Sequence, residues 1–162
     1  NEKTENVISS FFSLEGEYSD YCSEYVNILF KNLIRFVGDD FTPLVNAEIG
    51  DNDLTVIQEL CGDFSAVSAI SLDDKAAAVF ASRFAEEEVT DMDYAKDAIS
   101  EFLNLSNGLY NVNISESTGK EIGLTPQEST TASAVKSIKA KFMLTIPVEF
   151  TFGTVIFTLA VI

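Results

Sequence analysis

Residues Asp97 to Gly108 read DAISEFLNLSNG, and two kinds of residue recur in this stretch at intervals of three and four. The spacing predicts a helix from about Met92 to Val112, whose buried stripe comprises Ala95, Ala98, Ile99, Phe102, Leu105 and Leu109. A second row at the same spacing comprises Asp97, Glu101, Asn104 and Gly108. A helix with one apolar stripe must bury that stripe against another layer, so the rest of the chain has to supply one.

The polar row has two interpretations. Taken alone, an acid and an amide three residues apart on a helix are most often plain solvated surface. Gly108 favours the other interpretation, because a glycine inside a helix costs about 1 kcal/mol relative to alanine and removes the side chain beyond Asn104. The row is then a docking surface with clearance for a partner.

Two further helices are predicted on either side of a first hairpin. Apolar residues recur at helical spacing from about Tyr18 to Val37, and Gly38 stands where that helix would stop. The pattern Ser71-x-x-Asp74 is typical of the start of an alanine-rich helix that runs to about Ala85. The pattern Thr90-x-x-Asp93 has the same form and predicts the start of the central helix.

Four strands are predicted as two hairpins. Leu54–Cys61 and Phe64–Leu72 flank a Gly62-Asp63 turn, and Lys139–Phe150 and Thr154–Ile162 flank Gly153. Residues 39–53 are interpreted as an irregular connection. Pro147 has no amide hydrogen, which predicts a free sheet edge close to it.

The order of these elements predicts an α/β sandwich of the α+β type, in which helices pack on one face of an antiparallel sheet. We expect residues 1–16 to be an N-terminal arm and residues 17–162 to form a single domain. The long apolar hairpin at the C-terminus must be covered or paired, since an exposed row of Phe, Ile and Val would aggregate. A homodimer is therefore expected.

The composition argues against several classes of partner and of catalytic site. The 162 residues carry a net charge of −16, which argues against nucleic acid and anionic membrane surfaces as partners. No apolar run is long enough to cross a bilayer and no targeting segment is visible, so we expect a cytoplasmic protein. Histidine is absent, which argues against histidine bases and most zinc sites, and no glycine-rich phosphate loop is present. Cys22 and Cys61 are interpreted as buried free thiols.

The row D-x-x-x-E-x-x-N, followed by Gly108 and by Pro126, resembles the signature of the chemotaxis phosphatases CheC and CheX. The resemblance extends to the Gly62-Asp63 hairpin, the alanine-rich helix, the closing strand pair and the first helix, where Glu24-Tyr25-Val26-Asn27 is similar to the start of CheX. It covers the chain from about Ser19 onward. Leu109 departs from the family, which often has a small or amide residue there.

The resemblance implies a substrate, a phosphorylated receiver domain of the CheY type whose Mg²⁺ sits in the receiver itself. It implies that Asn104 positions the attacking water and that Glu101 pairs with a receiver lysine. Asp97 would extend the docking surface, and Gly108 would let the partner's backbone approach. No cofactor or metal is expected on this chain.

The first helix repeats the motif with Asp20, Glu24 and Asn27. CheC-type proteins have two such helices, so a second site is a real alternative. However, Lys31 occupies the position equivalent to Gly108, and no proline follows at the matching distance. The one-site CheX type therefore fits better.

A different class of function stays open. The chain could be a non-catalytic, dimerising interaction module of a larger two-component signalling protein. This alternative suits a sequence that begins with Asn1 instead of methionine. The two classes differ in whether the Glu101 and Asn104 row faces solvent or is buried in an oligomer contact.

Overall fold

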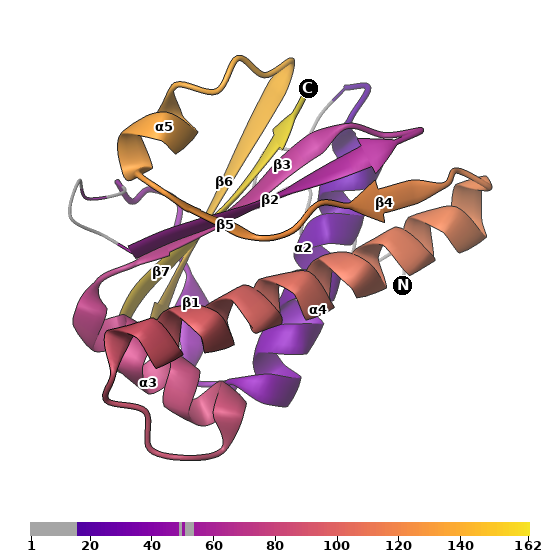
Figure 1. Ribbon diagram of the computed structural model, residues 1–162. Helices are drawn as coiled ribbons and strands as arrows, with labels where there is room; N and C mark the ends of the chain where they lie inside the picture. The colour runs from indigo at the N-terminus through magenta and orange to yellow at the C-terminus, as the bar shows by residue number, and fades with distance from the viewer. Residues whose placement is uncertain (1–15, 49, 51–53) are drawn as a thin grey trace.

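The computed structural model describes residues 16–48, 50 and 54–162, so the predicted N-terminal arm, apart from Gly16, lies outside the described residues. The elements follow in the order α2 (Ser19–Phe36), β1 (Phe41–Pro43), β2 (Leu54–Gly62), β3 (Ala66–Leu72), α3 (Asp74–Ala85), α4 (Met92–Thr118), β4 (Ile122–Leu124), β5 (Glu128–Thr130), α5 (Ala132–Lys136), β6 (Phe142–Phe150) and β7 (Gly153–Val161) (Figure 1). The chain thus has the α+β class predicted from its sequence.

One antiparallel sheet forms the centre of the described chain. Its strand order is β1-β6-β7-β3-β2-β4, and β5 also pairs with β2. Both predicted hairpins are confirmed, and the sheet joins them by pairing β3 with β7 along their whole length, for example Ala69 with Thr158. The four central strands are therefore fixed by two local hairpins and one long-range pairing.

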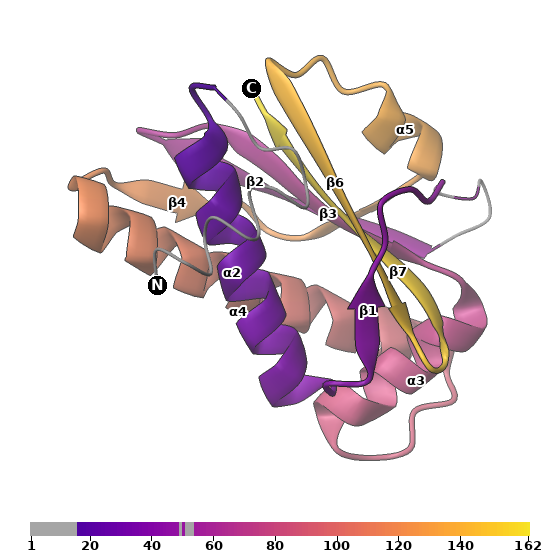
Figure 2. The same cartoon turned by 180° about the vertical axis from the view of Figure 1, so that it is seen from behind.

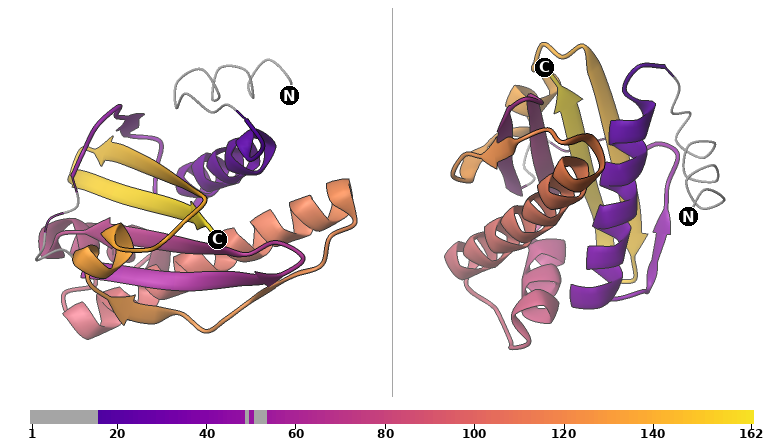
Figure 3. Two further views of the ribbon diagram at one scale, coloured as in Figure 1. Left: turned by 90° about the horizontal axis from the view of Figure 1, so that it is seen from above. Right: turned by 90° about the vertical axis from the view of Figure 1, so that its right-hand side faces the viewer.

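Helices α2, α3 and α4 pack on one face of this sheet. Figure 2 shows α2 crossing in front of α4, and in the right-hand view of Figure 3, α2 and α4 lie in front of the central strands. The core between these layers is rich in aromatic residues, and its largest fully buried side chains include Tyr110, Phe80, Phe102 and Phe157. Burying one such side chain stabilises the fold by roughly 1.5–3 kcal/mol. The short helix α5 covers part of the opposite face through a small apolar cluster of Ala69, Ala132, Val135 and Ile156.

The start signals of two helices differ from those predicted. Asp73, and not Ser71, caps α3 by accepting a hydrogen bond from the Ala76 amide at 2.7 Å. Asp91, and not Thr90, caps α4 through the Asp93 amide. In both cases an aspartate stands directly before the first helical residue, where its short carboxylate reaches the free amides of the first turn.

Helix α4 also runs further than predicted, to Thr118, where Gly119 ends it in the left-handed conformation at φ 75°. The predicted buried stripe is correct up to Phe102, but Leu105 is only half-buried and Leu109 is 43% exposed. Instead, Leu103, Ser106, Asn107, Tyr110, Asn111 and Ile114 face inward. The buried face therefore includes polar residues that an apolar pattern does not show.

Two other expectations have mixed outcomes. Both cysteines are free, and Cys22 is buried as expected, whereas Cys61 near the end of β2 is exposed. The region interpreted as an irregular connection contains β1. Of the described helices, none is long and apolar enough to span a membrane.

Candidate functional site

Asp97, Glu101 and Asn104 form an exposed row on α4. Next along the row, Gly108 leaves open space, since a methyl group built on it would meet no atom within 4 Å. Within the described part of the chain, neither carboxylate of the row forms an ion pair. The structure thus brings the four predicted residues together on a face with room for a partner.

The Asn104 side chain is tied to the sheet through Gln58, which lies in the middle of β2 and is only 1% exposed. Gln58 Nε2 donates to Asn104 Oδ1 at 2.8 Å and to the Thr125 carbonyl at 2.9 Å. Gln58 Oε1 accepts from Asn107 Nδ2 at 2.9 Å. These four residues come from β2, from α4 and from the connection after β4, and sequence reasoning identified only Asn104 among them.

The connection after β4 also carries the motif proline, Pro126. Its neighbour Thr125 is held to β2 from both sides, because the Thr125 amide donates to the Glu59 carbonyl and the Glu59 amide donates to Thr125 Oγ1, both at 3.0 Å. One residue after the proline, Gln127 Nε2 donates to the Ser100 carbonyl of α4 at 3.1 Å. Pro126 is therefore exposed in a loop that is fastened to both the sheet and the helix of the row.

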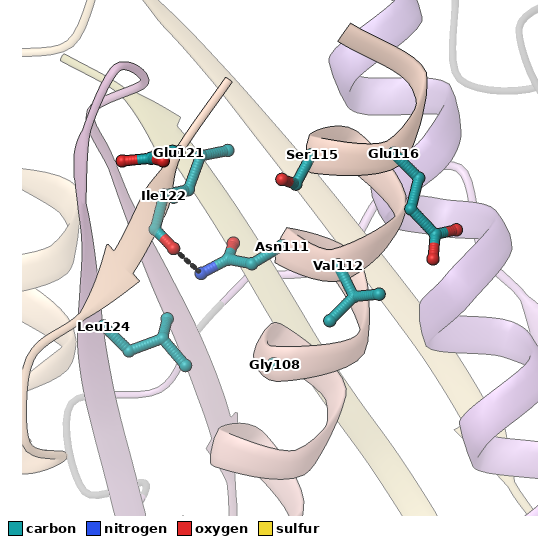
Figure 4. Close-up of a pocket in the computed structure, with 8 residues that line it drawn as sticks. All are labelled: Gly108, Asn111, Val112, Ser115, Glu116, Glu121, Ile122 and Leu124. Atoms are coloured by element: carbon teal, nitrogen blue, oxygen red, sulfur yellow. Dashed lines mark hydrogen bonds between the residues drawn. The ribbon is translucent and has the colours of Figure 1, made fainter. Parts of the chain in front are cut away.

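A groove of about 490 Å³ continues the row beyond Gly108, between α4 and β4. It is lined by Gly108, Asn111, Val112, Ser115, Glu116, Glu121, Ile122 and Leu124 (Figure 4). Asn111 points from the helix toward the strand and its Nδ2 donates to the Ile122 carbonyl at 3.4 Å (Figure 4). The candidate site therefore extends from the carboxylates of α4 into a partly apolar depression.

Known structures share this architecture over most of both chains. A chain of the CheX–CheY–BeF3–Mg²⁺ complex from Borrelia burgdorferi superimposes with a TM-score of 0.71 at 19% identity, covering 88% of this chain and 97% of that one. A CheC-like protein from Shewanella oneidensis gives 0.72 at 13% identity, covering 90% and 100%. The fold is that of the CheX and CheC-like chemotaxis proteins. CheX from Desulfovibrio desulfuricans gives a TM-score of 0.68 at 12% identity, covering 88% and 99%.

The shared fold rests on structure alone at these identities. The sequence matches no protein-family model and no curated protein sequence.

The first-helix copy of the motif is built differently from the row on α4. Glu24 Oε1 accepts a hydrogen bond from Asn113 Nδ2 at 2.9 Å, so that carboxylate is already engaged within the molecule. Asn27 is half-buried, and no hydrogen bond holds its side chain among the described residues. Lys31 is exposed where the α4 row has Gly108. Of the two motifs, only that on α4 has both a free carboxylate and an anchored amide.

The chain offers no cluster of three or more His, Cys, Asp or Glu side chains that could hold a metal ion, as far as the described residues extend. The row on α4 has two carboxylates, one full turn apart, and an amide. Such a set can bind a cation of a partner and orient a water molecule. The expectation that Mg²⁺ belongs to the partner stays a prediction.

Proposed function

We propose that this chain is a phosphatase that hydrolyses the aspartyl phosphate of a CheY-type receiver domain, with Glu101 docking the receiver and Asn104 positioning the water. The observation that carries the proposal is the exposed row on α4, in which an unpaired carboxylate precedes an anchored amide and then open space. The fold shared with a chain of a CheX–CheY complex supports the choice of partner.

The reaction needs little covalent chemistry from this chain. The oxygen of a water molecule forms a bond to phosphorus while the bond from phosphorus to the aspartyl oxygen breaks. The products are a free carboxylate and inorganic phosphate, which keeps the protons of the water. What accelerates such a step is holding the water in line and neutralising charge that is already present.

Asn104 suits the first task because an amide can accept from the water and donate toward a phosphoryl oxygen, and it does not titrate. Its Oδ1 has two lone pairs, of which Gln58 occupies one. One lone pair and both Nδ2 hydrogens are left for the water and the phosphoryl group.

Glu101 suits the second task. It lies three residues before Asn104 on the same helix face, so an ion pair with a receiver lysine would set how the amide enters the receiver's site. Asp97 would extend this contact by one turn, and Gly108 would admit the partner's backbone. In this proposal Mg²⁺ is held by the receiver, where it offsets phosphoryl charge, and the reaction takes place in the cytoplasm.

The net charge of −16 predicts weak, transient binding, because receivers of this type collect acidic residues around the phosphorylation site. Screening by salt and the local ion pair of Glu101 would offset this long-range repulsion.

The test is the decay of phosphorylated receiver domains from the same organism, labelled with a small-molecule phosphodonor, with and without the protein. We expect faster decay of at least one receiver. The matched control is Asn104→Ala, which preserves the helix and removes only the amide. A wild-type protein that accelerates the decay of no receiver would overturn the proposal.

One observation favours a second function. The fold also occurs in FliY from Thermotoga maritima, with a TM-score of 0.56 at 14% identity, and in a chain of the FliM–SpeE complex from H. pylori, with 0.59 at 8%. The alternative is a non-catalytic, dimerising interaction module of a larger signalling protein, and the occurrence of the fold in a chain of a protein–protein complex is compatible with it. It requires the α4 row to be buried against another chain, which labelling of a cysteine placed at Asp97 would detect in a Cys61→Ser background that lacks the exposed native thiol.

A further inference from the structure

We infer that Gln58 is a positioning residue that decides which end of the Asn104 amide faces the receiver. This inference rests on the proposed function and goes beyond it. An amide side chain has two ends of nearly equal shape, and its last torsion is broad and roughly two-fold. An exposed asparagine can therefore present either its oxygen or its NH₂ group unless something holds it.

The backbone carbonyl of Thr125 fixes the orientation of the Gln58 and Asn104 amides. The Thr125 carbonyl can only accept, so the end of Gln58 that faces it must be Nε2, at 2.9 Å. The same Nε2 reaches Asn104 at 2.8 Å, so Asn104 must turn its oxygen inward. The Asn104 NH₂ group consequently points away from Gln58, toward the open side of the row.

The burial of Gln58 restricts rotation of its side-chain amide. Gln58 is 1% exposed and both ends of its amide are engaged, since Oε1 accepts from Asn107 Nδ2. Rotating the Gln58 amide by 180° would place its oxygen against the Thr125 carbonyl, which cannot donate. This contact would be repulsive in a place from which water is largely excluded, where lost hydrogen bonds are costly.

The consequence for catalysis is preorganisation. With its amide already turned, Asn104 needs no reorientation when the receiver arrives, and groups fixed beforehand are the ones that stabilise a transition state. The motif on the first helix lacks such an orienting contact, because no hydrogen bond holds the Asn27 side chain in the described chain.

The experiment separates orientation from stability. Gln58→Met keeps the length of the side chain and removes the donor. Asn32→Ala is the control, because it removes a different buried hydrogen bond, from Asn32 Nδ2 to Ser106 Oγ at 3.1 Å, which contacts neither Gln58 nor Asn104. We expect Gln58→Met to lower kcat about tenfold with KM changed less than twofold. We expect Asn32→Ala to lower Tm comparably while kcat stays within twofold of wild type.

A double-mutant cycle completes the test. In an Asn104→Ala background, Gln58→Met should have no further effect on kcat, because the group that it orients is gone. The inference is overturned if Gln58→Met leaves kcat unchanged, if Asn32→Ala reduces kcat equally, or if the Gln58 and Asn104 effects are additive.

A measurement on the free protein needs no phosphatase activity. The ¹⁵N relaxation of the Asn104 side-chain amide reports how well it is ordered. An ordered amide in wild type that becomes mobile in Gln58→Met, or in Gln58→Leu if the first variant does not fold, supports the inference. A mobile amide in wild type overturns it. If wild type accelerates no receiver, the proposed function fails and this measurement decides the role of Gln58 by itself.

Discussion

At the scale of the residue, the proposed chemistry depends on Asn104. Replacing it with alanine should remove most of the acceleration and leave receiver binding nearly unchanged, because a water-positioning amide acts chiefly in the transition state. Losses of about 2–4 kcal/mol are typical for such a group. The measurement is the decay of a phosphorylated receiver, with affinity followed separately on a receiver that carries a stable phosphate mimic. An affinity that falls as far as the rate would contradict this role.

Glu101 should behave differently from Asn104. Glu101→Ala is expected to weaken binding of the phosphate-mimic receiver and to slow dephosphorylation, since an ion pair with the receiver lysine is already made on docking. Glu101→Gln is the matched control for size and should show most of the same loss, because it removes only the charge. Titration of the mimic-bearing receiver by calorimetry checks this, and unchanged affinity in both variants would exclude Glu101 as the docking residue.

The sequence predicts the row on α4 but not the residues that hold Asn104 in place. Asp97, Glu101, Asn104 and Gly108 lie in one helix, where spacing alone places them on one face. Gln58 could not be predicted as a neighbour, because its contact with Asn104 joins residues 46 positions apart. Leu109 was placed wrongly because the second half of α4 buries polar groups such as Asn107 against β2, so apolar periodicity no longer marks the inner face there.

At the scale of the element, α2 and α4 carry the same motif with different surroundings. Glu24→Ala and Asn27→Ala, alone or together, should change dephosphorylation less than twofold. The reasons are that Asn113 occupies the Glu24 carboxylate and that Lys31 stands where a partner needs clearance. The same decay assay checks this. A loss equal to that of Asn104→Ala would show a two-site enzyme of the CheC kind.

The long elements follow from sequence, and the short ones do not. Helix α2 and the two hairpins span enough residues for a period of 3.6 or 2 to appear. Strands β1, β4 and β5 have three residues each, which is too few for alternation to be recognised. Each of these short strands is defined by the longer strand with which it pairs. For example, Leu124 of β4 pairs with Leu60 of β2.

At the scale of the whole molecule, an ion pair joins segments that lie far apart in the sequence. Arg83 of α3 contacts Asp40 at 2.5 Å, and Thr151 in the β6–β7 turn also donates to Asp40. The hydrogen bond from Arg83, followed by that from Thr151, lowers the pKa of Asp40 from 3.8 to about 2. A lowered pKa in the folded state stabilises the fold above the unfolded value, and this stabilisation is lost as the pH falls through the folded value.

Asp40→Asn should therefore lower the free energy of unfolding at pH 7, by about 1 kcal/mol or less because both side chains are partly exposed. The difference from wild type should shrink below about pH 4 and vanish near pH 2. Urea unfolding across this range measures it. A difference that does not change with pH would assign the effect to packing instead of charge.

Assembly depends on the outer edge of β6. Strand β1 pairs only with Val148, Glu149 and Phe150, and among the described residues no strand covers the edge from Phe142 to Ile146. Pro147, which predicted a free edge, lies where this pairing ends. The hydrogen bond from the Leu44 amide to the Pro147 carbonyl, at 2.8 Å, is the last contact before the open stretch. In a strand, the backbone N–H and C=O groups of every second residue point to the same edge. The amides of Met143 and Thr145 therefore point to the open edge, on the same side of β6 as the Pro147 carbonyl.

An unpaired edge beside the 37% exposed Met143 favours pairing with a second copy of the chain. We expect a homodimer by light scattering. Thr145→Pro should convert it to a monomer with little loss of structure, because it deletes an outward amide that no strand of the described chain uses, as Pro147 already does naturally. Thr145→Ala is the control, since it keeps the outward amide and should leave the dimer intact. A monomer mass for the wild type across a wide concentration range would exclude this mode of assembly.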